Sequence, residues 1–78
     1  MNQTVDEIQA RWEKDGSIIP LRFTFQGHTL VVDSVGRSWR DEAGWHILCM
    51  AGSTGVYELI FTPNLTWEVR PPAGQFPG

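Results

Sequence analysis

The stretch that decides the fold is Trp39-Arg40-Asp41-Glu42-Ala43-Gly44-Trp45, in which two tryptophans flank an acidic turn that ends in glycine. On both sides of it, apolar and polar side chains alternate as they do in strands that are buried on one face. The stretch therefore joins two β segments. The length of its loop leaves two registers open, with Trp39 opposite either His46 or Leu48.

Before this turn, two shorter turns predict a three-stranded meander. Asp-Gly at residues 15–16 favours a two-residue hairpin turn, and Gln-Gly at 26–27 is a second turn candidate. The cross-strand pairs that share one apolar face are Ile8 with Phe23, Ala10 with Leu21, Trp12 with Ile19, Phe25 with His28, Phe23 with Leu30 and Leu21 with Val32. Pro20 lacks an amide hydrogen and must point away from a partner strand or lie at an irregularity. The alternation changes phase after Val32, which predicts a bulge or bend near Gly36.

After the turn, three further strands are expected at residues 45–51, 56–61 and 65–70. A turn at 52–55 sets Met50 opposite Tyr57 and Leu48 opposite Leu59. A three-residue loop at 62–64 then brings Trp67 against Leu59 and Val69 against Tyr57, on the same apolar face. The reverse face carries Ile47, Cys49, Val56 and Ile60.

These segments predict an all-β fold, an antiparallel meander of about six strands that curls into a small SH3-like barrel or roll. An open, strongly bent sheet is the alternative. The 78 residues allow a single domain, expected over residues 1–70. Residues 1–6 are expected to be frayed, and the Pro- and Gly-rich residues 71–78 to form a disordered tail. Four Trp, four Phe and one Tyr predict an aromatic core.

Composition excludes several functional classes. The formal charge of −3 counts against nucleic-acid binding, which depends on lysine and arginine. A single cysteine cannot form an intramolecular disulfide. The first 15 residues contain no apolar signal region, and no run approaches the roughly 20 apolar residues of a membrane span. We therefore expect a cytoplasmic protein without a membrane partner.

No motif in the sequence indicates catalysis, a metal or a cofactor. His46 and Cys49 are three residues apart, so on a strand they point to opposite faces and cannot easily share a metal ion. Ser53 lies in Gly-Ser-Thr-Gly, a sequence typical of a turn, and this sequence is not the Gly-x-Ser-x-Gly motif of a nucleophilic serine. No basic residue adjoins Cys49 to lower the pKa of its thiol. The sequence predicts a protein that is not an enzyme.

Two groups of residues are candidates for binding. Arg37, Trp39, Arg40 and Trp45 belong to the residue types most enriched at binding hot spots. Arginine stacked on indole, or burial of both tryptophans in the core, is the alternative for this group. The apolar residues of the reverse face would support self-association if nothing covers them, and a bent sheet that covers them is the alternative. These residues are Ile47, Cys49, Val56 and Ile60.

The chain also resembles a known family. The residues that carry the likeness are those at 20–27 with Val32, Trp39-Arg40, Trp45, Glu58-Leu59 and Trp67-Glu68-Val69. Over about residues 18–70 the chain is similar to a family of small uncharacterised bacterial β domains, some of which occur beside or fused to Y-family translesion DNA polymerases. We expect a non-enzymatic interaction module with an unknown protein partner, and the resemblance implies a setting as an accessory to DNA-repair machinery. Single-stranded nucleic-acid binding and a homodimeric structural role are the alternatives, with the chain a monomer or weak homodimer.

Overall fold

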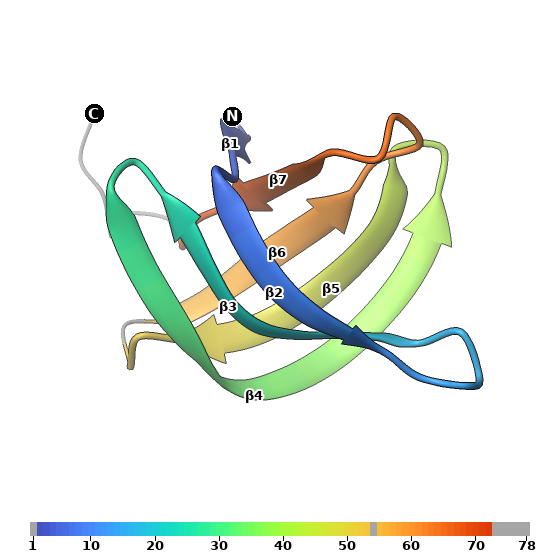
Figure 1. The fold of residues 1–78 in the computed structure, drawn as a ribbon, viewed down its shortest axis with the longest axis horizontal. Helices are drawn as coiled ribbons and strands as arrows, with labels where there is room; N and C mark the ends of the chain where they lie inside the picture. Colours follow the sequence, from blue (N-terminus) through green and yellow to red (C-terminus); the bar gives the residue numbers. More distant parts are fainter. Residues whose placement is uncertain (1, 54, 73–78) are drawn as a thin grey trace.

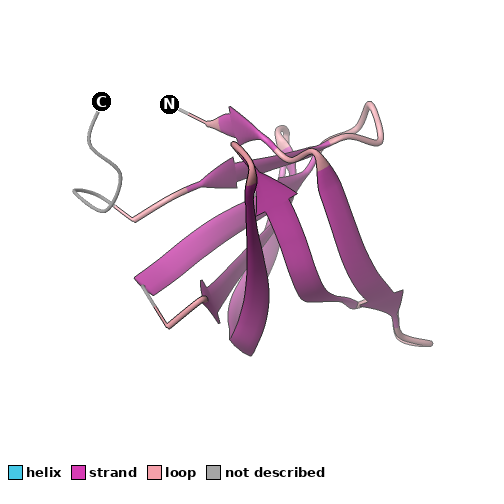
Figure 2. Cartoon of the chain, turned by 60° about the vertical axis from the view of Figure 1, so that its left-hand side comes forward, coloured by secondary structure: helices cyan, strands magenta, loops and turns pink. Residues whose placement is uncertain are grey.

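The computed structural model describes residues 2–53 and 55–72, which form one antiparallel sheet (Figure 1). Its seven strands are β1 (Gln3–Thr4), β2 (Glu7–Trp12), β3 (Ile18–Phe25), β4 (His28–Asp41), β5 (Gly44–Ala51), β6 (Gly55–Phe61) and β7 (Trp67–Arg70). Every regular element of this part of the chain is a strand (Figure 2). None of the described residues forms a helix that could cross a membrane. The predicted all-β meander is confirmed, with one more strand than expected.

The sheet curls into a half-barrel because its two end strands are consecutive in the chain. The strand order is β1-β7-β6-β5-β4-β3-β2, and only Val5 and Asp6 separate β1 from β2. The Val5 N–H donates to the Trp67 carbonyl at 3.0 Å, and the next amide, of Asp6, donates to the Thr24 carbonyl at 2.8 Å. Two consecutive amides thus join opposite ends of the sheet.

The segment expected to be frayed, residues 1–6, therefore contains a strand and a core residue. β1 pairs with β7 through Gln3 opposite Val69 and Thr4 opposite Glu68, and Val5 is buried. A two-residue strand of polar side chains has no periodicity that sequence reasoning can detect. The tail predicted at 71–78 lies outside the described residues from residue 73 onward.

The turn at Gln26-Gly27 has the predicted register. Phe25 lies opposite His28 and Phe23 opposite Leu30. Gln26 and Gly27 have φ angles of 50° and 77°, the left-handed values that a tight hairpin turn of this kind requires. The local chemistry of the turn was sufficient to fix this pairing.

The β2–β3 hairpin follows the prediction only as far as a bulge. Ile8 pairs with Phe23 as expected, but the register shifts between Gln9 and Ala10. The changed pairs are Ala10 with Pro20, Arg11 with Ile19 and Trp12 with Ile18. Leu21 is the extra residue of the bulge and is 43% exposed, while Trp12 is 57% exposed. The irregularity expected at Pro20 occurs here, because proline has no amide hydrogen for a regular ladder.

β4 is a strand of 14 residues that bends across both halves of the sheet (Figure 1). Its pairing with β5 shifts between Val32 and Ser34 and again between Val35 and Ser38. The second shift spans Gly36, so the predicted bend there is confirmed. At the far end of β4, Trp39 lies opposite His46. This is one of the two registers that the sequence allowed, the one with fewer residues between the paired positions.

The β5–β6 hairpin differs from the prediction by one residue. Ala51 pairs with Gly55, and therefore Cys49 lies opposite Tyr57 and Ile47 opposite Leu59. The predicted pairs of Met50 with Tyr57 and of Leu48 with Leu59 are wrong. Because the side chains of a strand alternate, a slip of one residue moves every side chain of β5 to the other face. Ile47 and Cys49, expected on the reverse face, are therefore in the core.

The last hairpin is longer than predicted but keeps its faces. Phe61 pairs with Trp67 and Leu59 with Val69, so the loop covers residues 62–66 and both pairs shift by two. A shift of two leaves Trp67 and Val69 on the apolar face. Leu65, predicted to lie on that face, is in the loop and is 75% exposed.

The core is aromatic at its centre, as the composition predicted. Tyr57 lies edge-on to Phe23 and Phe25, with ring centroids 5.6 Å and 6.2 Å away. All three side chains are fully buried. Trp67 also belongs to this core, whereas Trp12 and Trp39 remain outside it.

Candidate functional site

The β4–β5 hairpin divides the four predicted binding residues between its two faces. Trp39 pairs with His46, and Arg40 pairs with Trp45, and neighbouring cross-strand pairs point to opposite sides of a sheet. The guanidinium carbon of Arg37 lies 5.1 Å from the centre of the Trp39 ring, and that of Arg40 lies 5.9 Å from the Trp45 ring. The residues thus form two separate Arg–Trp pairs rather than one site.

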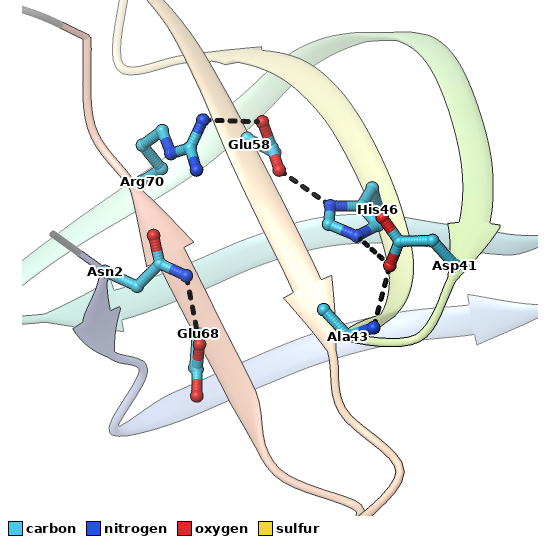
Figure 3. A network of polar contacts seen from close by, with 7 residues as sticks. All are labelled: Asn2, Asp41, Ala43, His46, Glu58, Glu68 and Arg70. Carbon is cyan, nitrogen blue, oxygen red and sulfur yellow. Dashed lines mark hydrogen bonds and ion pairs between the residues drawn. The ribbon is translucent and has the colours of Figure 1, made fainter.

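The pair formed by Arg37 and Trp39 covers a nearly buried histidine, His46. The ring of Trp39 stacks on His46 with centroids 4.9 Å apart and planes inclined by 5°. Both ring nitrogens of His46 meet carboxylates, Nδ1 at 2.7 Å from Glu58 Oε2 and Nε2 at 2.7 Å from Asp41 Oδ1 (Figure 3). The Ala43 amide also donates to Asp41 Oδ1 at 2.8 Å.

This geometry suits a doubly protonated imidazole. A neutral ring has one N–H, so one of its two nitrogens would face a carboxylate oxygen with no hydrogen between them. Burial lowers the pKa of His46, but the hydrogen bonds that its ring donates to Glu58 and Asp41, together with their negative charges, outweigh burial and raise the pKa overall. The hydrogen bond to His46 in turn lowers the pKa of Asp41. Sequence reasoning missed this cluster because it placed His46 on the inner face.

The cluster is structural rather than a metal site. Glu58 and Asp41 contact opposite nitrogens of one ring, so the three side chains do not converge on a common point. The other oxygen of Glu58, Oε1, lies 3.7 Å from Arg70 Nη1 (Figure 3). The polar groups of the cluster therefore pair with one another and link β4, β5, β6 and β7.

The cluster predicts that the protein loses stability as the pH rises above the ordinary pKa of histidine, about 6.5. A raised pKa for His46 means that its contribution is complete below about pH 6.5 and is lost as the pH rises through the folded-state pKa. The contribution of Asp41, whose pKa is lowered, is present above about pH 3.9 and is lost as the pH falls. We expect the melting temperature to be highest between these limits and to fall at higher pH, by about 4–8 °C for each 1 kcal/mol lost.

Thermal melts of His46→Gln between pH 5 and 9 test this expectation. The variant should be less stable at pH 5.5 and should lack the decline of the wild type at higher pH. His28→Gln is the matched control, because His28 is the second of the two histidines and lies exposed at the β3–β4 turn. An alkaline decline that persists in His46→Gln and disappears in His28→Gln would contradict the assignment.

The second Arg–Trp pair borders an open groove. We call it the aromatic groove, and its lining includes Arg40, Trp45, Phe61, Pro63 and Leu65. The groove encloses about 290 Å³ and lies between the β4–β5 turn and the loop that joins β6 to β7. Its composition, largely apolar with arginine at one side, is typical of sites that bind peptide side chains.

Aromatic rings support Phe61 from two sides. Trp67 stacks on Phe61 with centroids 4.8 Å apart, and Trp12 meets it edge-on at 6.4 Å. Trp67 is buried in the core, whereas Trp12 is more than half exposed. The wall of the groove is therefore held by the core and continues onto an exposed tryptophan at the end of β2.

Leu65 is the most unusual residue of the groove. Its φ angle is 64° and its side chain is 75% exposed. The left-handed region costs a residue with a Cβ atom about 1–2 kcal/mol, and Leu65 recovers little of this by packing. Its backbone is held by the loop, in which the Leu65 amide donates to the Thr62 carbonyl at 3.0 Å and the Thr62 amide donates to the Thr66 carbonyl at 2.9 Å.

The predicted self-association patch does not exist as a surface. Ile47, Cys49 and Ile60 are each at most 2% exposed, and only Val56 is open, at 50%. The slip of one residue in the β5–β6 register is the reason for Ile47 and Cys49. Burial also raises the pKa of the Cys49 thiol to about 11, so the thiol is unreactive.

Two surfaces thus combine tryptophan with arginine. The stack of Arg37 and Trp39 rests on a cluster whose polar groups are already paired, while the aromatic groove leaves Leu65 open to solvent. Leu65 could not be found from the sequence, because no local pattern marks a leucine with a positive φ angle. Comparisons of this chain with protein families, with curated proteins and with solved structures find no match.

Proposed function

We propose that this chain is a non-enzymatic interaction module that binds an apolar peptide segment of a partner protein in the aromatic groove. The observation that carries the proposal is the exposure of Leu65 at a φ angle of 64°. A strained backbone that the surrounding structure maintains is a recognised mark of functional sites. Here the strain presents an apolar side chain to solvent, where a partner can cover it.

The lining of the groove supports the same conclusion. Trp45 and Arg40 are of the types that contribute most to hot spots, and Phe61 is fixed by Trp67 behind it. Rigid aromatic side chains lose little conformational entropy on binding, so a small groove can still provide useful affinity. The size of the groove suits one or two side chains of a peptide, as in transient complexes.

The setting we propose for this partner comes from the resemblance of residues 18–70 to bacterial β domains found beside Y-family polymerases. A cytoplasmic protein of the DNA-repair machinery is the partner class it suggests. The resemblance assigns no residue of the groove, so the peptide site and the setting are separate parts of the proposal and can fail separately.

Selection of peptides from a displayed library, followed by calorimetry with the selected sequence, tests the proposal. Leu65→Asn removes the apolar side chain, and asparagine tolerates positive φ better than most residues, so the fold should be retained. We expect its affinity to fall about tenfold or more, the loss of a hot-spot side chain. Val56→Thr, at an exposed apolar residue on β6 outside the groove, is the matched control and should bind as the wild type does.

Single-stranded nucleic acid is the competing ligand. Its aromatic platform would be Trp39 beside Arg37, on the opposite face of the hairpin from Trp45. A fluorescent oligonucleotide at low salt separates the two functions. Binding that is abolished by Trp39→Ala and unaffected by Leu65→Asn would overturn the peptide proposal.

A further inference from the structure

The outer edge of β2 is a second surface with recognisable complementarity. β2 ends the strand order on one side, whereas β1 at the other end has only two residues. An edge strand presents unpaired backbone N–H and C=O groups along its free side. This free side begins after Val5 and Asp6, whose amides are bonded to Trp67 and Thr24.

β2 itself is regular, because the extra residue of the β2–β3 bulge lies in β3. Ile8 and Ala10 are half-buried and pack against the core. The residues that alternate with them along the strand point to the outer face and are exposed. These outer residues are Glu7, Gln9 and Arg11.

We propose that β2 pairs antiparallel with β2 of a second copy of this chain, about a two-fold axis through Gln9. Residues directly opposite each other in an antiparallel pair share one face. In this register Glu7 of each copy lies opposite Arg11 of the other, and Ile8 lies opposite Ala10. The outer face gains two ion pairs, each between a glutamate and an arginine. On the inner face, the apolar side chains at the edge of one core meet those of the other.

Neighbouring registers that keep the same faces lack this match. A two-fold axis through Ala10 would set Glu7 opposite Glu13, which are like charges. An axis through Ile8 would set Glu7 opposite Gln9 and Asp6 opposite Ala10, so neither acidic side chain would face a basic one. Registers displaced by one residue would place charged side chains opposite half-buried apolar ones.

Arg11 is available for this pairing. Its Nε and Nη2 atoms each lie 3.2 Å from Glu13 Oε1, and neither contact uses Nη1. Arg11 and Glu13 are both exposed, so their contact is weak and readily shared. Glu7 of the second copy can therefore pair with Arg11, whose guanidinium still has N–H donors that do not contact Glu13.

Cross-linking at the two-fold axis tests the register. In Gln9→Cys the two introduced cysteines would be directly opposite, with Cα atoms about 4.5–5.5 Å apart, within the range of a disulfide. In the control Glu7→Cys the two sulfurs would be four strand residues apart, about 13 Å. Under mild oxidation we expect Gln9→Cys to form a covalent dimer much faster than Glu7→Cys. The native Cys49 does not interfere, because it is buried and its pKa is raised to about 11.

Charge exchange tests the pairing itself by sedimentation equilibrium. Glu7→Arg or Arg11→Glu alone replaces both ion pairs by like charges and should raise the dimer dissociation constant about tenfold. The double exchange should restore the wild-type value. Glu42→Arg and Lys14→Glu make the same changes of net charge outside β2 and should have little effect.

Three results would overturn the inference. The first is a monomer mass for the wild type up to millimolar concentration. The second is equal cross-linking rates for Gln9→Cys and Glu7→Cys. The third is protection of the β2 amides by a groove-binding peptide in a monomeric protein, which would assign the edge to that peptide. Circular dichroism of each variant would confirm that it is folded.

Discussion

Gly44→Ala is expected to destabilise the protein by at least about 3 kcal/mol, a large part of what a small domain possesses. Gly44 has a φ angle of 129°, and a Cβ atom there would lie 2.1 Å from the Phe61 carbonyl oxygen and 3.0 Å from Thr62 Cα. Both are backbone atoms, so no change of rotamer relieves the clash. The start of β5 would have to separate from the end of β6. Urea denaturation followed by tryptophan fluorescence measures the loss.

Gly27→Ala is the matched control for this experiment. Gly27 also has a positive φ angle, 77°, but a Cβ atom there would meet no heavy atom within 4 Å. Its substitution therefore introduces backbone strain alone, about 1–2 kcal/mol. Equal losses for the two variants would contradict the close approach of β5 to β6 at Gly44.

Phe23→Ala should have a comparable effect, a loss of about 3–5 kcal/mol in the free energy of unfolding. Phe23 is 1% exposed, and its ring packs against those of Phe25 and Tyr57, with centroids 6.0 Å and 5.6 Å away. Its removal leaves a cavity at the centre of a thin core that has few other residues to fill it. If the loss exceeds the stability of the wild type, Phe23→Ala will be unfolded at room temperature and its thermal melt will show no cooperative transition.

Leu21→Ala separates the observed bulge from the regular register that the sequence suggested. In a regular hairpin Leu21 would share the apolar face with Phe23, but as the extra residue of the bulge it is 43% exposed. We expect its substitution to cost less than about 1 kcal/mol, as at other partly exposed positions. A loss as large as that of Phe23→Ala would show that β2 and β3 pair without the bulge.

Part of the aromatic groove could be anticipated from the sequence. The Trp39–Trp45 stretch identified Arg40 and Trp45 as binding candidates, and both border the groove. The binding candidates also included Arg37 and Trp39, and Trp39 lies on the other face of the hairpin because neighbouring side chains of a strand alternate. Leu65 and the His46 cluster were missed, because they depend on a backbone angle and on a register that no local pattern specifies.

The sequence by itself determined the strands and the pairings whose turns are specified by local chemistry. Alternation marked the strands, and Gln26-Gly27 fixed β3 against β4. Tertiary structure decided two kinds of feature. The first is a strand pairing that a register slip of one residue would invert, and the second is a set of hydrogen bonds that join segments far apart in the chain. The β5–β6 pairing was settled by which face of β5 fits the core around Tyr57, since a slip of one residue inverts a strand at almost no local cost. The closure at Val5 depends on β3 and β7 both being in place, because its hydrogen bonds and those of Asp6 join opposite ends of the sheet.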